Sequence, residues 1–468
     1  MTDAYVVGSG PNGLAGALVL ARAGLRVTVL EAADTIGGGT RSGELTLPGL
    51  LHDHCSAVHP MGVGSPFLRE LGIEWLWPEV DLAHPLDGQD PAVMVRDIAV
   101  TAGDLGSDGA AWRRLFGPLA ANFDAINGDI LRPLVHVPKH PLLLARFGTR
   151  ALLPASVLAR RWKGDQARAL FAGVAAHAFR PLQSPGSAAV GVALVAAGHA
   201  SGWPVAKGGS RAISDALAGE LLALGATFET GTTVRTLNHL DGIVLLDLAP
   251  EAAADLVGDR MPARVQRAYR RYRHGPGAFK VDLAVEGGVP WRDDACRRAG
   301  TVHVGGTFEQ IAASERAVSQ GRMPADPFVL VAQQYLADPG RSVGDVHPVW
   351  AYAHVPHGWD GDATEVLLDQ VERFAPGLRE RIVGRSSRSP MQLQAYNANY
   401  VGGDVVTGAN DLLQVALRPR VAVDPYSTGV PGVFLCSAAT PPGAGVHGMC
   451  GVNAAQAALK QAGRPRRR

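Results

Sequence analysis

The first forty residues follow the order strand, glycine turn, helix, strand and acid. Residues 4–7 predict a short buried strand, Gly8-Ser9-Gly10-Pro11-Asn12-Gly13 follows directly, and residues 26–30 predict a second strand that ends on Glu31. The glycines of such a motif allow a tight turn, the approach of a diphosphate to the backbone, and close packing of helix on strand. The free N–H groups and dipole at the helix start attract phosphates. We therefore expect a Rossmann-type dinucleotide-binding domain.

The residues after the second strand bear on which dinucleotide is bound. Glu31 is placed to accept hydrogen bonds from ribose hydroxyls, and its charge would repel a 2′-phosphate, which argues against an NADP-type ligand. A second glycine turn, Gly37-Gly38-Gly39-Thr40-Arg41, adds a basic residue beside the diphosphate. No second GxGxxG follows a strand, so we expect a single dinucleotide site and no separate NAD(P)H site.

The C-terminal region favours FAD over NAD. A strand over 432–435 runs into small residues, and a block rich in glycine, residues 441–451, precedes a helix expected over 452–460. A helix start at this place would direct backbone N–H groups at a flavin pyrimidine ring, where negative charge gathers on reduction. The alternative interpretation is an ordinary glycine-rich loop that caps a helix.

These three blocks together resemble the phytoene desaturase-like flavoproteins, relatives of the amine oxidases, and in particular their poorly characterised bacterial branch. Residues 204–210 and 375–378 extend the resemblance over nearly the whole chain. Two features depart from that family: a hairpin after Val234 is missing, and His447 stands where carotenoid desaturases have an apolar residue or proline. The second departure weakens the transfer of a carotenoid substrate to this chain.

The resemblance implies an α/β protein, in which a glutathione reductase-like FAD domain is interleaved with an α+β substrate domain. We expect the FAD domain over 1–75, 200–260 and 385–468, and the substrate or lid domain over 76–199 and 261–384. The residues expected to bind FAD are Gly8, Gly10, Pro11, Asn12, Gly13, Glu31, Gly37, Gly38, Gly39, Thr40, Arg41, Ser56, Val234, Ala439, Gly445, Gly448, Cys450, Gly451 and Val452.

The candidate catalytic residues are His59 and His447, because each lies in a segment that the resemblance places beside the flavin. A histidine there can act as a general base, since its pKa lies near neutrality. The alternative for both is a hydrogen bond to backbone or cofactor. Lys207 and Lys280 are weighed as active-site lysines and neither is assigned. The cysteines show no CxxC pair and no metal-ligand spacing, so no metal is expected.

The leading functional hypothesis is an FAD-dependent oxidoreductase that abstracts hydride from a lipophilic substrate, in a desaturation or dehydrogenation. Electrons would pass to oxygen, a quinone or another protein. Three alternatives stay open: an FAD amine oxidase, a redox-neutral flavin isomerase, and a non-catalytic flavoprotein that binds a partner. A formal net charge of +1 does not favour nucleic acid as a partner. The substrate and the oligomeric state stay open.

Location is inferred from what the sequence lacks. The first strand begins at Ala4, which leaves no room for an export signal, so we expect the cytoplasm. Residues 131–163 interleave apolar residues with arginine and include Trp162, which suits a peripheral membrane contact. The alternative is a helical lid over the active site. The basic tail, residues 464–468, is interpreted as solvated, with contact to anionic lipid as the alternative.

Overall fold

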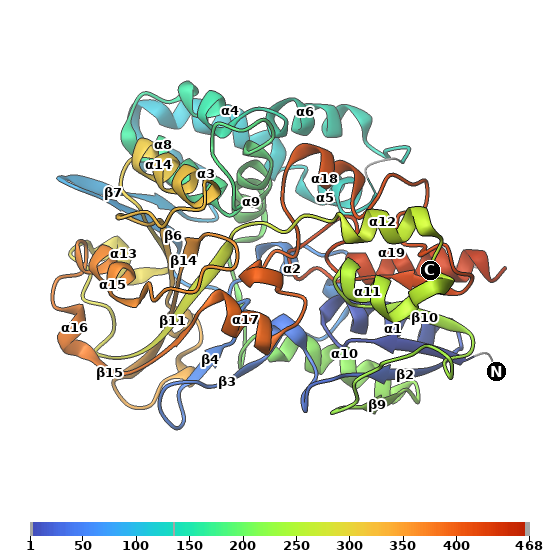
Figure 1. The fold of residues 1–468 in the computed structure, drawn as a ribbon. Coiled ribbons are helices and arrows are strands. Elements are labelled where there is room, and N and C mark those ends of the chain that lie inside the picture. The colour runs from blue at the N-terminus through green and yellow to red at the C-terminus, as the bar shows by residue number, and fades with distance from the viewer. Residues whose placement is uncertain (1–2, 134–135, 464–468) are drawn as a thin grey trace.

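A computed structural model describes residues 3–133 and 136–463, so the basic tail lies outside the described residues. Figure 1 shows two lobes, one around β2, β9 and β10 and the other around β6, β11 and β14. Each lobe is built around its own sheet, and the strands of each sheet come from separate stretches of the chain.

The first sheet is parallel and has the order β16-β10-β1-β2-β9. One face is covered by α1 (Pro11–Arg22), α10 (Arg211–Ala223) and α19 (Met449–Gln461), and the other by α11 (Pro250–Val257) and α12 (Ala263–Arg270). Apolar strands covered on both faces are typical of a doubly wound α/β domain. Its strands are β1 (Asp3–Val7), β2 (Arg26–Leu30), β9 (Thr227–Glu229), β10 (Ile243–Leu246) and β16 (Val433–Leu435).

The second sheet is mixed and has the order β15-β11-β14-β13-β12-β6-β7, with a parallel pair only between β12 and β6. Its strands are β6 (Val80–Leu86), β7 (Gln89–Met94), β11 (Gly277–Glu286), β12 (Ala299–Val304), β13 (Val329–Ala332), β14 (Val346–Val355) and β15 (Ile382–Arg388). Helices lie on both faces: α3 (Ile98–Asp104), α4 (Gly109–Ala120), α8 (Asp165–Ala176), α9 (Ala188–Ser201) and α14 (Phe308–Ser319) belong to one core, and α13 (Asp294–Arg298), α15 (Thr364–Glu372) and α16 (Leu378–Arg381) border the other.

Shorter elements connect the two sheets. Two small ribbons pair β3 (Ser42–Glu44) with β4 (Leu51–Asp53) and β5 (Trp75–Leu76) with β8 (Val205–Ala206). The remaining helices are α2 (Pro60–Val63), α5 (Phe123–Ile130), α6 (Pro141–Ala151), α7 (Ala155–Leu158), α17 (Pro390–Tyr396) and α18 (Leu412–Leu417).

Four local expectations are corrected. The alternation of apolar and polar residues over 279–285 predicts a half-buried strand, but β11 is buried from Gly277 to Val285, because helices and loops cover both faces of its sheet. The sequence of residues 76–199 predicts a mostly helical region, but this region begins with β6 and β7, which join that sheet. No strand is described around Val234; the chain there runs as a loop between β9 and β10. The helix expected from Val452 begins earlier, at Met449.

The segment considered for a membrane contact is mostly a set of surface helices. No described helix is by itself long and apolar enough to cross a bilayer; α6 and the helical stretch Ala155–Arg161 reach that length only together, across a bend of 98°. Leu142 is exposed on α6, but Trp162 is 2 % exposed and packs against Trp112 and Phe171. Trp162 is therefore a core residue, which corrects its interpretation as an interfacial anchor. Leu134 and Val135, in the same segment, lie outside the described residues.

Candidate active site between the two sheets

One cavity of about 900 Å³ extends from the glycine turn after β1 to a face of the second sheet. This volume lies at the upper end of the range for ligand sites in proteins. Both sheets contribute to its wall, together with α2, α9 and the loops around α17 and α18. The cavity is therefore placed where one ligand bound to the first sheet would meet another lying on the second.

The glycine turn leaves room for a ligand at the start of α1. Helix α1 begins at Pro11, after Gly10, and Gly8 has a φ of 97°, which a residue with a side chain rarely adopts. A Cβ atom on Gly38 would lie 3.0 Å from the Cα of Gly10, so the two glycine turns are in contact. The Oδ1 atom of Asn12 is buried without a hydrogen-bond partner in a residue that lines the cavity. Free N–H groups at a helix start and an orphaned amide oxygen fit a diphosphate and its ribose.

Glu31 is held at the end of β2 with its carboxylate on the cavity. The backbone N–H of Ser9 donates to Glu31 at 2.9 Å, and the N–H of Ala33 donates at 2.9 Å to its other oxygen. Arg41 lies 3.4 Å from Glu31 and also contacts the ring of Tyr396. The acid and the base that the sequence assigns to ribose and diphosphate thus lie side by side.

Most of the predicted cofactor-binding residues line this cavity. They are Gly8, Gly10, Pro11, Asn12, Glu31, Gly38, Gly39, Thr40, Arg41, Ser56, Val234, Ala439 and Gly445. The cavity wall does not include six others: Gly13, Gly37, Gly448, Cys450, Gly451 and Val452.

Packing explains why three of the six lie behind the wall. A Cβ atom on Gly451 would collide with the carbonyl of Asn12, and one on Gly448 would lie 2.9 Å from Ala15, so both glycines permit the close packing of α19 on α1. The Cys450 thiol is buried and donates to the carbonyl of Gly443 at 3.2 Å. These residues support the site from behind, through helix packing.

His447 also lies behind the wall. Its Nδ1 atom accepts from the N–H of Met449 at 3.1 Å, which satisfies one free donor at the start of α19, and Ser65 donates to its carbonyl at 2.7 Å. Burial lowers its pKa to about 4. A neutral histidine whose ring nitrogen holds a helix start is a positioning residue, and this placement does not support the predicted catalytic role.

His59 has a similar placement. It is 1 % exposed, and its Nε2 atom shares a 2.9 Å hydrogen bond with the hydroxyl of Ser210. Burial lowers its pKa to about 4. Its neighbours Val58 and Pro60 line the cavity, whereas its own ring packs toward Trp75. His59 thus fixes the segment beside the cavity, and its predicted catalytic role also lacks support.

The apolar end of the cavity is a face of the second sheet. Leu330 of β13 is paired with Tyr352 of β14, and Tyr352 is paired in turn with Lys280 of β11. These side chains, with Trp350, line the cavity. Lys280 and Tyr352 alternate with apolar core residues along their strands, but only the pairing of β11, β14 and β13 brings them to one face, and no local sequence feature shows that pairing.

Lys280 is a buried charge at the edge of this face. It is 2 % exposed, forms an ion pair with Asp282 and lies 5.7 Å from the ring centre of Trp350. Burial lowers its pKa, and Asp282 opposes that shift. Lys207, by contrast, forms an exposed ion pair with Glu74, outside the cavity. The structure thus places Lys280, and not Lys207, at the site.

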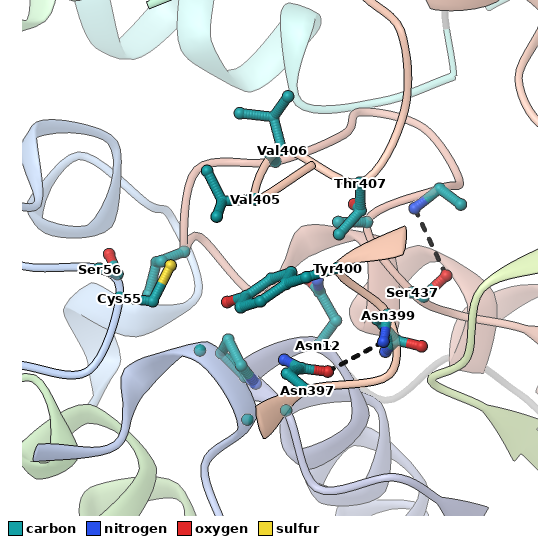
Figure 2. Close-up of a pocket in the computed structure, with 18 of the residues that line it drawn as sticks. Asn12, Cys55, Ser56, Asn397, Asn399, Tyr400, Val405, Val406, Thr407 and Ser437 are labelled. Carbon is teal, nitrogen blue, oxygen red and sulfur yellow. Dashed lines mark hydrogen bonds between the residues drawn. The ribbon is translucent and has the colours of Figure 1, made fainter. Parts of the chain in front are cut away.

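A loop after α17 completes the wall near the second glycine turn. Figure 2 shows Tyr400 between Cys55 and the turn that carries Asn397 and Asn399, in which the N–H of Asn399 donates to Asn397 at 3.1 Å. Tyr400 is buried and contacts Gly39, where any Cβ atom would collide with its hydroxyl. This loop was not predicted as part of the site, because it carries no motif and only the fold brings it to residues 37–56.

Asp247 is the charged residue that sequence reasoning missed. It ends β10, lines the cavity and accepts from the N–H of Gly13 at 3.1 Å. Burial raises its pKa to about 7, and nearby Glu31 adds to the shift. Its position directly after a buried strand is the signal that was available, since the carboxyl ends of parallel strands meet at one edge.

Comparisons with known proteins agree with this architecture. A family model described as an NAD(P)-binding Rossmann-like domain matches residues 6–71. The chain is similar to the rat protein named pyridine nucleotide-disulfide oxidoreductase domain-containing protein 2, with 23% identity over 97% of this chain and 92% of the relative. It is 27% identical to an uncharacterised protein of Mycobacterium bovis over 79% of this chain and 77% of that protein.

A solved structure of putrescine oxidase bound to putrescine has a TM-score of 0.62 and 17% identity, over 99% of both chains. The expected α/β class, with its Rossmann-type domain, is confirmed, and the fold resembles that of an amine oxidase, as expected.

Proposed function

We propose that this chain, which has the fold of the amine oxidase and phytoene desaturase-like superfamily, is an FAD-dependent oxidoreductase acting on an apolar, uncharged substrate. The observation that carries the proposal is the single cavity that joins the glycine turns to the apolar face of the second sheet. In the proposed reaction a substrate carbon–hydrogen bond loses hydride, a neighbouring carbon loses a proton, and a double bond forms. Oxygen, a quinone or another protein then takes the electrons.

The described residues fit FAD at one end of the cavity. The start of α1 and Arg41 would hold the diphosphate, Glu31 the ribose, and the segment from Pro442 to Val446 the ring system. When bound, FAD supplies the hydride acceptor. The family model matches the first βαβ unit, whose fold serves the adenosine diphosphate moiety that FAD shares with NAD(P).

The charges along the wall support an uncharged substrate. Among the described residues, the acids that line the cavity are Glu31 and Asp247, both at the glycine-turn end. Lys280 at the sheet face is already paired with Asp282. A cation lying on the sheet face would meet no free carboxylate, so burial would cost it its hydration without a partner.

Amine oxidation is the second candidate. Six aromatic residues line the cavity: Phe179, Trp203, Trp350, Tyr352, Tyr396 and Tyr400. Aromatic faces stabilise an amine, and the superfamily neighbour putrescine oxidase is named for an amine substrate. Anaerobic bleaching of the flavin separates the two candidates. Bleaching by squalene but not by cyclohexylamine supports the leading one, and the reverse supports amine oxidation.

The cofactor is tested by the visible spectrum of the purified protein and of the material that heat releases. We expect a two-banded yellow spectrum and released FAD. Gly10→Ala should abolish the colour, because its Cβ atom would lie 2.5 Å from Asp247 and fill the space beside the diphosphate. Gly219→Ala in α10 is the matched control, since a Cβ atom there meets nothing within 4 Å. A colourless wild type that FAD cannot restore would refute the proposal.

A further inference from the structure

The far side of the sheet face carries two polar side chains that no assigned role explains. Thr301 lies on β12, and the strand order places it three strands from β11, which carries Lys280. At about 4.8 Å between neighbouring strands, this separates β12 from β11 by about 14 Å. Thr301 lines the cavity, is 1 % exposed, and its hydroxyl has no hydrogen-bond partner in the described structure. A buried hydroxyl without a partner costs free energy unless a ligand satisfies it.

His177 is the second polar group, and it also lines the cavity. Its Nε2 atom shares a 3.0 Å hydrogen bond with Nε2 of His303, which is on β12 two residues from Thr301 and therefore on the same face of the strand. His177 packs edge-on against Trp203, another residue of the wall. The two groups thus belong to one corner of the cavity.

The hydrogen-bond balance indicates which nitrogen of His177 carries the proton. Nδ1 of His303 is buried without a partner. A buried N–H without an acceptor is rarer in proteins than an unused acceptor, so His303 carries its proton on Nε2 and donates it to Nε2 of His177. The proton of His177 is then on Nδ1, which has no partner among the described residues. Burial lowers the pKa of His177 to about 3, so the ring is a neutral donor.

We propose that Thr301 and His177 form a polar anchor that binds a neutral oxygen, a carbonyl or a hydroxyl, of an otherwise apolar substrate. This inference deepens the proposed function, on which it rests, by naming a second feature of the substrate. An N–H and an O–H donate to one oxygen acceptor, and no acid that lines the cavity is described at this end to hold a cation. Among the described residues no group of His, Cys, Asp or Glu is arranged to hold a metal ion, so the histidines are not explained as a metal site.

The anchor is tested by binding two probes of the same shape, decan-2-one and 2-methyldec-1-ene, to the protein as purified. Dissociation constants are measured by tryptophan fluorescence, since Trp203 and Trp350 line the cavity. We expect the ketone to bind about tenfold more tightly, as two hydrogen bonds of ordinary net strength allow. Thr301→Val, which keeps the shape and removes the hydroxyl, should reduce this preference by about threefold or more and leave the affinity for the alkene unchanged.

Thr301→Ser is the matched control and should keep the preference, while His177→Leu should reduce it as Thr301→Val does. Equal affinity of the wild type for ketone and alkene, including no binding of either, would overturn the anchor, as would an unchanged preference in Thr301→Val. The readout needs no flavin. A protein that lacks FAD and still prefers the ketone would refute the proposed function and leave the anchor standing.

Discussion

Asp247 places a carboxylate where the proposed cofactor brings two phosphates. Its Oδ2 atom accepts a hydrogen bond from the N–H of Gly13, so this N–H is not free to bind a phosphate. Only protonation of Asp247 removes its charge. Burial raises the pKa of Asp247 from 3.8 to about 7. The proton on Asp247 therefore makes its full contribution to the stability of the folded state below pH 3.8. This contribution is lost as the pH rises through about 7.

Asp247→Asn should therefore stabilise the protein at about pH 8 and not at about pH 4. The size of the pKa shift of Asp247 limits the gain in the free energy of unfolding to about 4 kcal/mol. The variant should also bind FAD more tightly at about pH 8, because the diphosphate no longer meets a like charge. Thermal melts across the pH range and FAD titration measure both effects. Asp104→Asn, an exposed acid on α3, is the control, and equal melting profiles for wild type and Asp247→Asn would contradict this account.

His447 gives the opposite kind of expectation, a loss of stability without a loss of chemistry. Removing its ring leaves the N–H of Met449 at the start of α19 without a partner. We expect His447→Ala to lower the free energy of unfolding by about 1–2 kcal/mol, as for a lost helix cap, and to retain substrate-dependent flavin reduction. His447→Asn, whose amide oxygen can accept the same N–H, should recover part of the stability. A folded, yellow His447→Ala variant that no substrate reduces would restore the catalytic interpretation.

At the scale of elements, Trp162 decides between a lid and a membrane contact. It lies in the core between α4 and α8, beside Phe116 and Phe171. Trp162→Ala should lower the free energy of unfolding by about 3–5 kcal/mol, because it leaves a large cavity. Leu142→Ala on the exposed face of α6 should change it little. A Trp162→Ala variant with normal stability that no longer floats with anionic vesicles would support the membrane contact instead.

Elements with strong local signals were predictable, and those decided by distant packing were not. β1, α1 and β2 follow from glycine spacing and two apolar runs, and the structure has both strands within a residue of the expected bounds, with α1 between them. β11 alternates as expected, with Phe279, Val281 and Leu283 in one core and Lys280 on the cavity face, but both faces are buried. Its covering helices come from other parts of the chain, so no local feature of residues 277–286 reveals them.

The site shows the same division. Gly10 and Glu31 were predicted correctly to lie together, because one βαβ unit fixes both. Asp247 contacts Gly13 across 234 positions of sequence, and that contact depends on β10 pairing with β1. His447 was placed in the right segment, but the direction of a side chain in an irregular loop depends on its neighbours. The sequence can thus predict which segment borders the cavity, but not which way a side chain in that segment points.

At the scale of the whole molecule, a buried ion network joins the two lobes. Arg341, which is fully buried, donates to Asp53 at 2.6 Å, to Asp338 at 3.0 Å and to the carbonyl of Ala206 at 2.9 Å. Asp53 also accepts from the N–H of Ser210 at 2.7 Å. These residues come from β4, β8 and the loops after β13 and β8, so the network holds distant parts of the chain in register.

Arg341→Met should lower the free energy of unfolding by about 3–5 kcal/mol, because it leaves Asp53 buried without its partner. Burial raises the pKa of Asp53, but the Arg341 guanidinium and the hydrogen bonds from Ser42 and Ser210 together hold the net pKa below 3.8. The stability from Asp53 is therefore full above pH 3.8 and lost as the pH falls below it, so the deficit of the variant should shrink in acid. Denaturant titration measures it, with the exposed Arg298→Met as control. A small deficit at neutral pH, equal to that of the control, would contradict the role.

The connectivity of the parallel sheet has a consequence for how the protein is made. β1 and β2 emerge first from the ribosome, but β10 and β16, which lie beside β1 and beside β10, come more than two hundred and more than four hundred residues later. Helix α19, which packs on α1, is later still. The nascent chain therefore carries its glycine turn for most of its synthesis without the neighbours that shape the cavity. Loading of the proposed FAD would then be a step of maturation that follows translation, and the supply of flavin would act on finished chains.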